Sequence, residues 1–316
     1  MPNPMVLVNS ISLLEAQASS EIENIVTTTD ELFRFAENPD SATNPETKET
    51  LRYRQALFAG LESIRERPLS ATTAIEVCER IHEREIGVRA LPGTFIGNPS
   101  NREAIYTPPT GERVIRDKLA NWEIYLHAQD EVDPLVRMAV AHYQFEAIHP
   151  FADGNGRTGR ILNVLFLVQA GLLSAPILYL SRYIIGRKND YYRLLLEVTR
   201  DGRWEDWIRF VLTGLEETAN RTLGKIDQVQ ELQELVRREL RDATTAGSNS
   251  DLLDLLFEKP YARISDVIER CGVSRPTATG WLDALVQAGS LLTVKIGRER
   301  LFINARFIDI LARDRL

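Results

Sequence analysis

A long stretch without any charged side chain limits what this chain can fold into. From Ile161 to Ser181 there is no Asp, Glu, Lys or Arg, which is about the length of a membrane-spanning helix. However, the stretch contains polar residues and Pro176, and its apolar run breaks at Gly171. We therefore expect a helix buried in a protein core that ends before Gly171, followed by an extended segment over residues 177–180.

The composition is that of a water-soluble protein and argues against several classes. The chain has 316 residues, 44% hydrophobic and 26% charged, which is enough for two domains. Cys78 and Cys271, the two cysteines, form neither a disulfide framework nor a CxxC metal motif. The net charge of −7 disfavours a protein built chiefly to neutralise nucleic-acid phosphates. Because the start also lacks the regions of a secretory signal, we expect a cytoplasmic protein without membrane contact.

Helical patterns dominate the chain, so the predicted fold class is mainly α. The apolar spacing predicts helices within residues 1–37, 46–67, 71–85, 133–148, 191–199 and 204–220. Short β-type runs among Pro and Gly pairs predict one hairpin between residues 87 and 111. Residues 221–247 are expected to form a charged connector helix and a flexible linker. Residues 248–316 show helices, a Gly turn, a helix and two strands, which is typical of a small winged helix-turn-helix domain.

The residues that carry chemistry are concentrated in HPFADGNGRTGR, residues 149–160. Its three glycines match the spacing of a dinucleotide-binding loop. However, the loop follows a helix, and no acidic residue lies between Asp153 and Asp190 to hold a ribose, so we exclude that function. What remains is a glycine-rich loop that opens directly into a helix. The free N–H groups and the dipole of such a helix form an anion-binding site.

The side chains of this loop fit phosphate chemistry. Arg157 and Arg160 stand three residues apart, so both can reach one polyphosphate. Asp153 at the loop edge can hold Mg²⁺ together with phosphate oxygens. His149 precedes a proline, which places it at the loop mouth as a base for an incoming hydroxyl. The alternative is a capped helix with salt-bridged arginines and a structural histidine.

The same twelve residues resemble the signature of the Fic family, HPFx[DE]GNGRxxR, and match it at every fixed position. The resemblance covers about residues 46–220 as a catalytic domain and leaves residues 1–45 as an N-terminal segment. It implies an all-helical Fic fold with a β-hairpin flap. It also implies a protein adenylyltransferase that transfers AMP from ATP to a Ser, Thr or Tyr hydroxyl of a target protein and of itself.

The resemblance assigns roles by position. His149 is implied as the base that deprotonates the hydroxyl, and Asp153 as the ligand of Mg²⁺. The residues implied in ATP binding are Asp153, Gly154, Asn155, Gly156, Arg157, Arg160 and, on the adenine side, Tyr192. The residues implied in the flap, which docks the target by strand addition, are Thr94, Phe95, Ile96 and Gly97.

The segment SSEIEN, residues 19–24, matches the family's inhibitory pattern [ST]xxxE[GN], in which Ser19 and Asn24 accompany Glu23. The resemblance implies that Glu23 pairs with Arg160 of the same chain and keeps this arginine from the γ-phosphate. Related proteins can also use this glutamate to remove AMP from a modified target. The alternative is that residues 20–23 are an ordinary capping box at a helix start, which has no effect on activity.

Two kinds of partner fit the C-terminal domain. It holds ten basic and nine acidic residues, a more balanced charge than typical DNA readers have. We therefore favour recognition of a protein target or self-association as a homodimer over DNA binding. The alternative function is an ATP-sensing, DNA-binding regulator without transfer activity. The intact His149 favours the enzyme, because a sensor needs no base.

Overall fold

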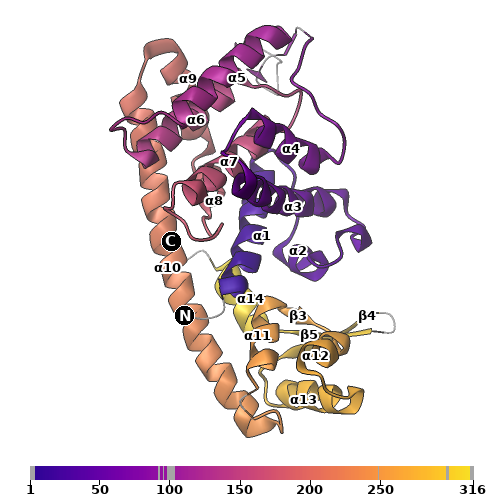
Figure 1. The fold of residues 1–316 in the computed structure, drawn as a ribbon. Coiled ribbons are helices and arrows are strands. Elements are labelled where there is room, and N and C mark those ends of the chain that lie inside the picture. The colour runs from indigo at the N-terminus through magenta and orange to yellow at the C-terminus, as the bar shows by residue number, and fades with distance from the viewer. Residues whose placement is uncertain are drawn as a thin grey trace. The chain divides into compact units, whose positions relative to one another are not determined.

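The structure is a computed structural model and describes residues 4–91, 93–94, 96–97, 104–247, 249–296 and 299–313 (Figure 1). The described chain is mainly helical, as predicted. It divides into two compact units, and the first comprises residues 15–27 and 39–219. The second comprises the chain up to Leu14, residues 28–38 and the chain from Asn220 onward. The helices α1 (Pro4–Ile22) and α10 (Trp204–Ala243) contribute residues to both units.

The first unit is a bundle of helices with a two-stranded hairpin. Its further elements are η1 (Pro39–Ser41), α3 (Pro45–Glu66), α4 (Ala71–His82), β1 (Ile96–Gly97), β2 (Ala104–Tyr106), α5 (Glu112–Leu126), α6 (Pro134–Ile148), α7 (Asn155–Gln169), α8 (Leu180–Gly186) and α9 (Lys188–Asp201). The hairpin between residues 87 and 111 is confirmed: Ile96 pairs with Tyr106 and Gly97 with Ala104 in antiparallel register.

The helix α7 lies at the centre of this unit. Nearly all of its residues are buried, and it packs against α3, α4 and α6. Gly60 of α3 permits a close approach to α7, since a Cβ atom at this position would lie 2.6 Å from Leu165. The helix ends at Gln169, and Gly171 follows with a φ of 72°. The uncharged stretch is therefore a buried core helix that ends before Gly171, as predicted.

Several elements differ from the expectation. The helix α5 was not predicted, and α8 begins at Leu180, at the end of the segment expected to be extended. The helix predicted for residues 204–220 and the predicted connector helix form one continuous helix, α10, which runs to Ala243. The helix α10 contains no proline, and Gly224 lowers helix propensity without ending the helix. The charged turns after residue 220 therefore continue the same helix.

The second unit combines short helices with a small sheet. Its elements are α2 (Thr29–Phe35), α11 (Ser250–Glu258), β3 (Tyr261–Ala262), α12 (Ile264–Cys271), α13 (Arg275–Gln287), β4 (Leu292–Ile296), β5 (Glu299–Ile303) and α14 (Ala305–Ala312). The strand order is β3-β5-β4, and both pairings are antiparallel. The Tyr261 hydroxyl donates a hydrogen bond to Asp30, and Lys259 pairs with Glu37 at 3.3 Å. The segment around α2 therefore packs with the C-terminal elements.

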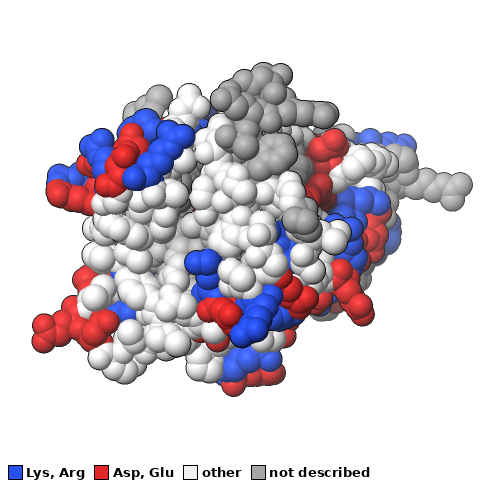
Figure 2. Space-filling model, turned by 90° about the horizontal axis from the view of Figure 1, so that it is seen from above, with Lys and Arg blue, Asp and Glu red and all other residues white. Residues whose placement is uncertain are grey.

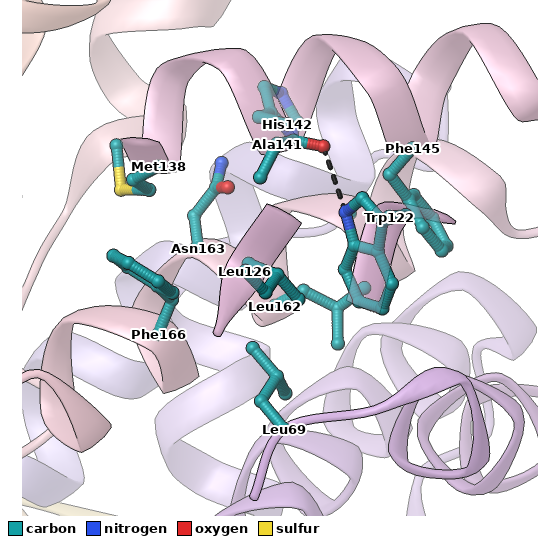
Figure 3. Close-up of a pocket in the computed structure, with 11 residues that line it drawn as sticks. Leu69, Trp122, Leu126, Met138, Ala141, His142, Phe145, Leu162, Asn163 and Phe166 are labelled. Carbon is teal, nitrogen blue, oxygen red and sulfur yellow. Dashed lines mark hydrogen bonds between the residues drawn. The ribbon is translucent and has the colours of Figure 1, made fainter. Parts of the chain in front are cut away.

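A small cavity lies in the core of the first unit, between α5, α6 and α7 (Figure 3). Its volume is about 10 Å³, and most of its lining is apolar, with His142 and Asn163 as polar exceptions. The Trp122 indole donates a hydrogen bond of 3.1 Å to the Ala141 carbonyl beside it. A space of this size holds one water molecule at most, so it is part of the core and not a ligand site. None of the described helices combines the length and apolar character needed to cross a membrane.

Candidate active site

His149 lies at the carboxyl end of α6, where the backbone turns sharply. Its φ of 50° is in the left-handed region, and its N–H donates to the Phe145 carbonyl at 3.0 Å. Burial, and then the positive charge of Arg89, lowers the pKa of His149 to about 4. The imidazole is therefore neutral at neutral pH and free to accept a proton.

The loop that follows His149 opens the helix α7. Gly154 precedes its first residue with a φ of 83°, and a Cβ atom there would lie 2.6 Å from Nε2 of His82. The N–H of Gly154 donates to Oδ1 of Asp153 at 2.7 Å, while 68% of the Asp153 side chain is exposed. The first turn of a helix leaves N–H groups without partners inside the helix. An exposed carboxylate and an anion-binding helix end thus meet at this loop.

Asn155 and Arg157, both predicted to bind phosphate, bond to other groups of the protein in this structure. The Asn155 amide accepts a hydrogen bond from the Phe151 N–H and donates one to its carbonyl, both at 2.8 Å. The Arg157 guanidinium is 2% exposed and pairs with Glu49 at 2.5 Å. In this structure both side chains therefore hold protein groups, and their contact with ATP stays a prediction.

Arg160 meets the N-terminal helix. Its Nη2 atom lies 2.8 Å from Oε1 of Glu23, and its Nε and Nη2 atoms donate to the hydroxyl and carbonyl of Ser19 at 2.8 and 3.0 Å. A Cβ atom on Gly156 would lie only 2.5 Å from the same Glu23 oxygen. The Glu23 carboxylate therefore contacts the first turn of α7, where an anion is favoured.

The segment around Glu23 ends a helix. The helix α1 ends at Ile22, and Asn24 follows with a φ of 63°. A capping box opens a helix, so the capping-box interpretation of Ser20 and Glu23 was wrong. Asparagine tolerates the left-handed conformation that commonly stops a helix, which explains an Asn or Gly at the last position of the inhibitory pattern.

Two buried carboxyl groups near this site were missed by sequence reasoning. Glu15, two turns before Glu23 on α1, accepts hydrogen bonds from the Ser181 N–H at 3.0 Å, from the Ser181 hydroxyl and from the Tyr53 hydroxyl at 3.3 Å. Burial raises the pKa of Glu15 to about 7. The bonds tie α1 to α3 and α8. No local sequence pattern indicates them, because both partners are distant in the chain.

The second buried carboxyl group is Glu146, one turn before His149. Its Oε1 atom has no hydrogen-bond partner among the described residues, and burial, together with Glu23, raises its pKa to about 7. A Cβ atom on Gly159 would lie 2.6 Å from Oε1 of Glu146, so this carboxyl group lies close to the backbone of α7. Glu146 thus faces α7 from α6, next to the pair of Glu23 and Arg160.

The remaining predicted residues lie in different surroundings. Tyr192 is 41% exposed and packs edge-on against Tyr191, with Glu23 and Arg160 close enough to affect its pKa. Thr94 has no regular structure, and Ile96 and Gly97 form β1. Phe95, also predicted for the flap, lies outside the described residues.

Comparison with known proteins agrees with this geometry. A model of the Fic/DOC family matches residues 68–167, and a model of the Fic/DOC family N-terminal region matches residues 1–62. A model of the C-terminal domain of SoFic-like protein adenylyltransferases matches residues 229–307.

Curated relatives match part of the chain. Protein adenylyltransferase fic-1 of Caenorhabditis briggsae is 32% identical over 121 residues, which are 38% of this chain and 22% of the relative. Protein adenylyltransferase Fic of Nematostella vectensis is 32% identical over 139 residues, 44% of this chain and 31% of the relative. The chain thus spans less than a third of the length of either protein.

Solved structures match the fold. A Fic family protein from Desulfovibrio desulfuricans has a TM-score of 0.56 and 21% identity, with 93% of this chain and 86% of that chain covered. A Fic-domain signalling protein from Bacteroides thetaiotaomicron has a TM-score of 0.58 and 19% identity, with 71% and 89% covered. The chain therefore belongs to the Fic/DOC family, with that family's N-terminal region and Fic domain followed by a C-terminal domain of the SoFic-like protein adenylyltransferase type.

Proposed function

We propose that this protein transfers AMP from ATP to a hydroxyl group of a target protein and of itself. The observation that carries the proposal is the position of His149 at the end of α6, directly before the glycine-rich loop that opens the anion-binding end of α7. The imidazole accepts the proton of the hydroxyl while its oxygen attacks Pα of ATP. The bond between Pα and the bridging oxygen to Pβ breaks, and pyrophosphate leaves. The α7 N–H groups and Arg160 stabilise the charge on the phosphates.

Asp153 is the residue that would hold Mg²⁺. Its carboxylate is exposed at the loop edge, and a hard oxygen donor of this kind, completed by phosphate oxygens and water, fits Mg²⁺. The ion would neutralise charge on the phosphates. Gly154 and Asp153 are fixed by their own hydrogen bond, so the carboxylate is oriented before the ion arrives.

The same site supports self-inhibition. Glu23 holds Arg160 and lies against the first turn of α7, where the terminal phosphates of ATP would lie. An arginine that binds this carboxylate is unavailable to the γ-phosphate, and the carboxylate repels the polyphosphate. ATP then binds weakly or with Pα misplaced.

A protein target fits the described surface better than a nucleic acid. The face drawn in Figure 2 carries charged side chains of both signs side by side around a broad area of uncharged ones. The short strand β1 offers backbone groups to an added strand of the target. In the C-terminal domain, which we interpret as a winged helix for partner recognition, Arg300 is paired with Asp283 at 2.6 Å.

Labelled ATP tests the proposal. The purified chain is incubated with ATP labelled on either the α- or the γ-phosphate, and label on the protein is counted. AMP transfer predicts α-label only. His149→Ala is expected to lose roughly 10²- to 10⁴-fold in rate while its Kd for ATP changes little. His127→Gln, outside the site at the end of α5, is the matched control and should keep its activity. Label transferred to the protein from the γ-phosphate would contradict the proposal, as would equal rates for His149→Ala and the parent.

A further inference from the structure

The backbone at His149 needs support from elsewhere in the protein. A positive φ at a residue other than glycine is strained, and such residues persist where their surroundings hold them in place. In addition, the last carbonyl groups of α6 have no partners within the helix. Something outside α6 must satisfy these carbonyls and fix the turn that carries the imidazole.

Arg89, in the segment between α4 and β1, makes these contacts. Its Nε atom donates to the His149 carbonyl at 2.7 Å, and its Nη2 atom donates to the Ile148 carbonyl at 3.3 Å and to the Pro109 carbonyl. The backbone N–H of Arg89 donates to the Pro150 carbonyl at 2.9 Å. The residue is 7% exposed, so these bonds are shielded from water. Arg89 thus bonds to the backbone before and after the turn at His149.

The chemistry of arginine suits this position. Its planar guanidinium offers several donors in fixed directions, which a lysine ammonium cannot reproduce. A cation at the carboxyl end of a helix is also stabilised by the helix dipole. The contact with Pro109 ties the turn to the segment that follows β2, so the base and the predicted flap share one support.

We propose that Arg89 is a positioning residue for His149, which fixes the direction of the imidazole and keeps a positive charge beside it. This inference rests on the proposed function of His149 as the base. Arg89 acts through the backbone. Without it, the turn relaxes and the imidazole moves away from the attacking hydroxyl.

The test compares two buried arginines at opposite ends of α6, of which Arg137 also pairs with Asp130. Arg137, at its amino end, is 5% exposed and donates to the Tyr125 carbonyl at 2.6 Å, so its loss also destabilises the fold. Arg89→Met, Arg89→Lys and Arg137→Met are made in the full chain carrying Glu23→Gly. The rate of self-modification at saturating ATP is measured from pH 5 to 8, with the Kd for ATP and the melting temperature.

We expect Arg89→Met to lower the rate by roughly ten- to a hundredfold, since small misplacements of a reacting group have effects of this size. The acid limb of its pH–rate profile, where the rate falls as His149 is protonated, should move to higher pH. Its Kd for ATP should stay within about threefold of that of the parent. Arg89→Lys keeps the positive charge but loses the fixed donor directions of the guanidinium. This variant should therefore have a reduced rate but the same acid limb as the parent. Arg137→Met should lower the melting temperature without moving the acid limb.

Histidine NMR separates this proposal from the proposed function. The titration of the His149 imidazole, assigned by its loss in His149→Ala, does not depend on activity. Its midpoint should rise in Arg89→Met and stay unchanged in Arg137→Met, even if no transfer occurs at all. An unchanged midpoint in Arg89→Met, or the same rise in Arg137→Met, overturns the role of Arg89. If Arg89→Met does not fold, Arg89→Lys decides: a rate equal to that of the parent overturns the proposal.

Discussion

The Glu23 carboxylate and the Arg160 guanidinium, 137 residues apart in sequence, lie 2.8 Å from each other across α1 and α7. Arg160 is almost fully buried, whereas about a third of the Glu23 side chain is exposed. In the proposed self-inhibition, this carboxylate decides whether the buried guanidinium is available to the γ-phosphate of ATP.

Removal of this carboxylate should activate the enzyme. Glu23→Gly frees Arg160 and the first turn of α7 for the γ-phosphate, so self-modification should rise at least tenfold over the parent and the Kd for ATP should fall. Arg160→Ala on top of Glu23→Gly should cancel the gain, because paired residues are not additive. Scintillation counting of α-labelled protein and calorimetric titration with ATP measure both effects.

Glu21→Gly is the matched control for this prediction. It removes a carboxylate from the last turn of α1, two residues before Glu23, at a residue outside the pair with Arg160. If it activates as strongly as Glu23→Gly, the effect comes from a weaker helix end and not from the ion pair.

Gly154→Ala should damage the anion-binding loop. The φ of 83° is strained for alanine, and the added Cβ atom would lie 2.6 Å from His82 and 3.2 Å from the Cys78 sulfur. Strain of this kind costs roughly 1–3 kcal/mol. Urea unfolding should show this loss, and in the Glu23→Gly chain the affinity for ATP should fall. Gly186→Ala, at a site with no atom within 4 Å of the new Cβ, should change neither.

Glu146→Gln should alter how stability depends on pH. The pKa of Glu146 is raised to about 7, so between about pH 4.5 and 7 the folded state keeps a proton that the unfolded state has lost. Its contribution to stability is therefore lost as pH rises through this window. The variant should lose less free energy of unfolding between pH 5 and 7.5 than the parent does.

Other groups near Glu146 also titrate, so the comparison between the two chains is the readout. Glu23, Arg160 and Tyr191 face it, and burial lowers the pKa of His142 to about 3, which has the opposite effect on stability. These contributions are common to both chains. Parallel curves of unfolding free energy against pH would show that Glu146 is ionised in the folded state.

Glu15→Ala should loosen α1. The variant leaves the Ser181 N–H and the Tyr53 hydroxyl without their buried acceptor, which costs roughly 1–3 kcal/mol. Because α1 carries Glu23, self-modification should rise with the loss of stability, whereas Glu15→Gln keeps an acceptor and should stay closer to the parent. An unchanged rate in a destabilised Glu15→Ala would show that Glu23 stays in place without this anchor.

The sequence predicted the parts of the site that depend on local rules. The glycine-rich loop, the start of α6 at Pro134 and the end of α7 before Gly171 follow from capping, proline and glycine preferences that act within a few residues. The pair of Glu23 and Arg160 was predicted only because a motif connects two distant segments.

The contacts that were missed join residues far apart in the chain. Arg89 reaches three carbonyls about 20 to 60 residues away, and Glu15 reaches Ser181. A single arginine in a loop or a single glutamate in a helix carries no sign of such partners. The placement of Arg157 against Glu49 was missed for the same reason, since an arginine near a phosphate loop is equally able to bind a carboxylate.

Under the self-inhibition proposed above, the closeness of Glu23 to Gly156 also has a kinetic consequence. Since the blocking carboxylate belongs to the same chain, its effective concentration is set by the fold and does not change with the amount of protein. Dilution cannot relieve the block, whereas rising nucleotide can outcompete it. The proposed enzyme would therefore respond to the ATP concentration of its surroundings: its rate would rise gradually with ATP, over a concentration range fixed by how firmly Glu23 is held.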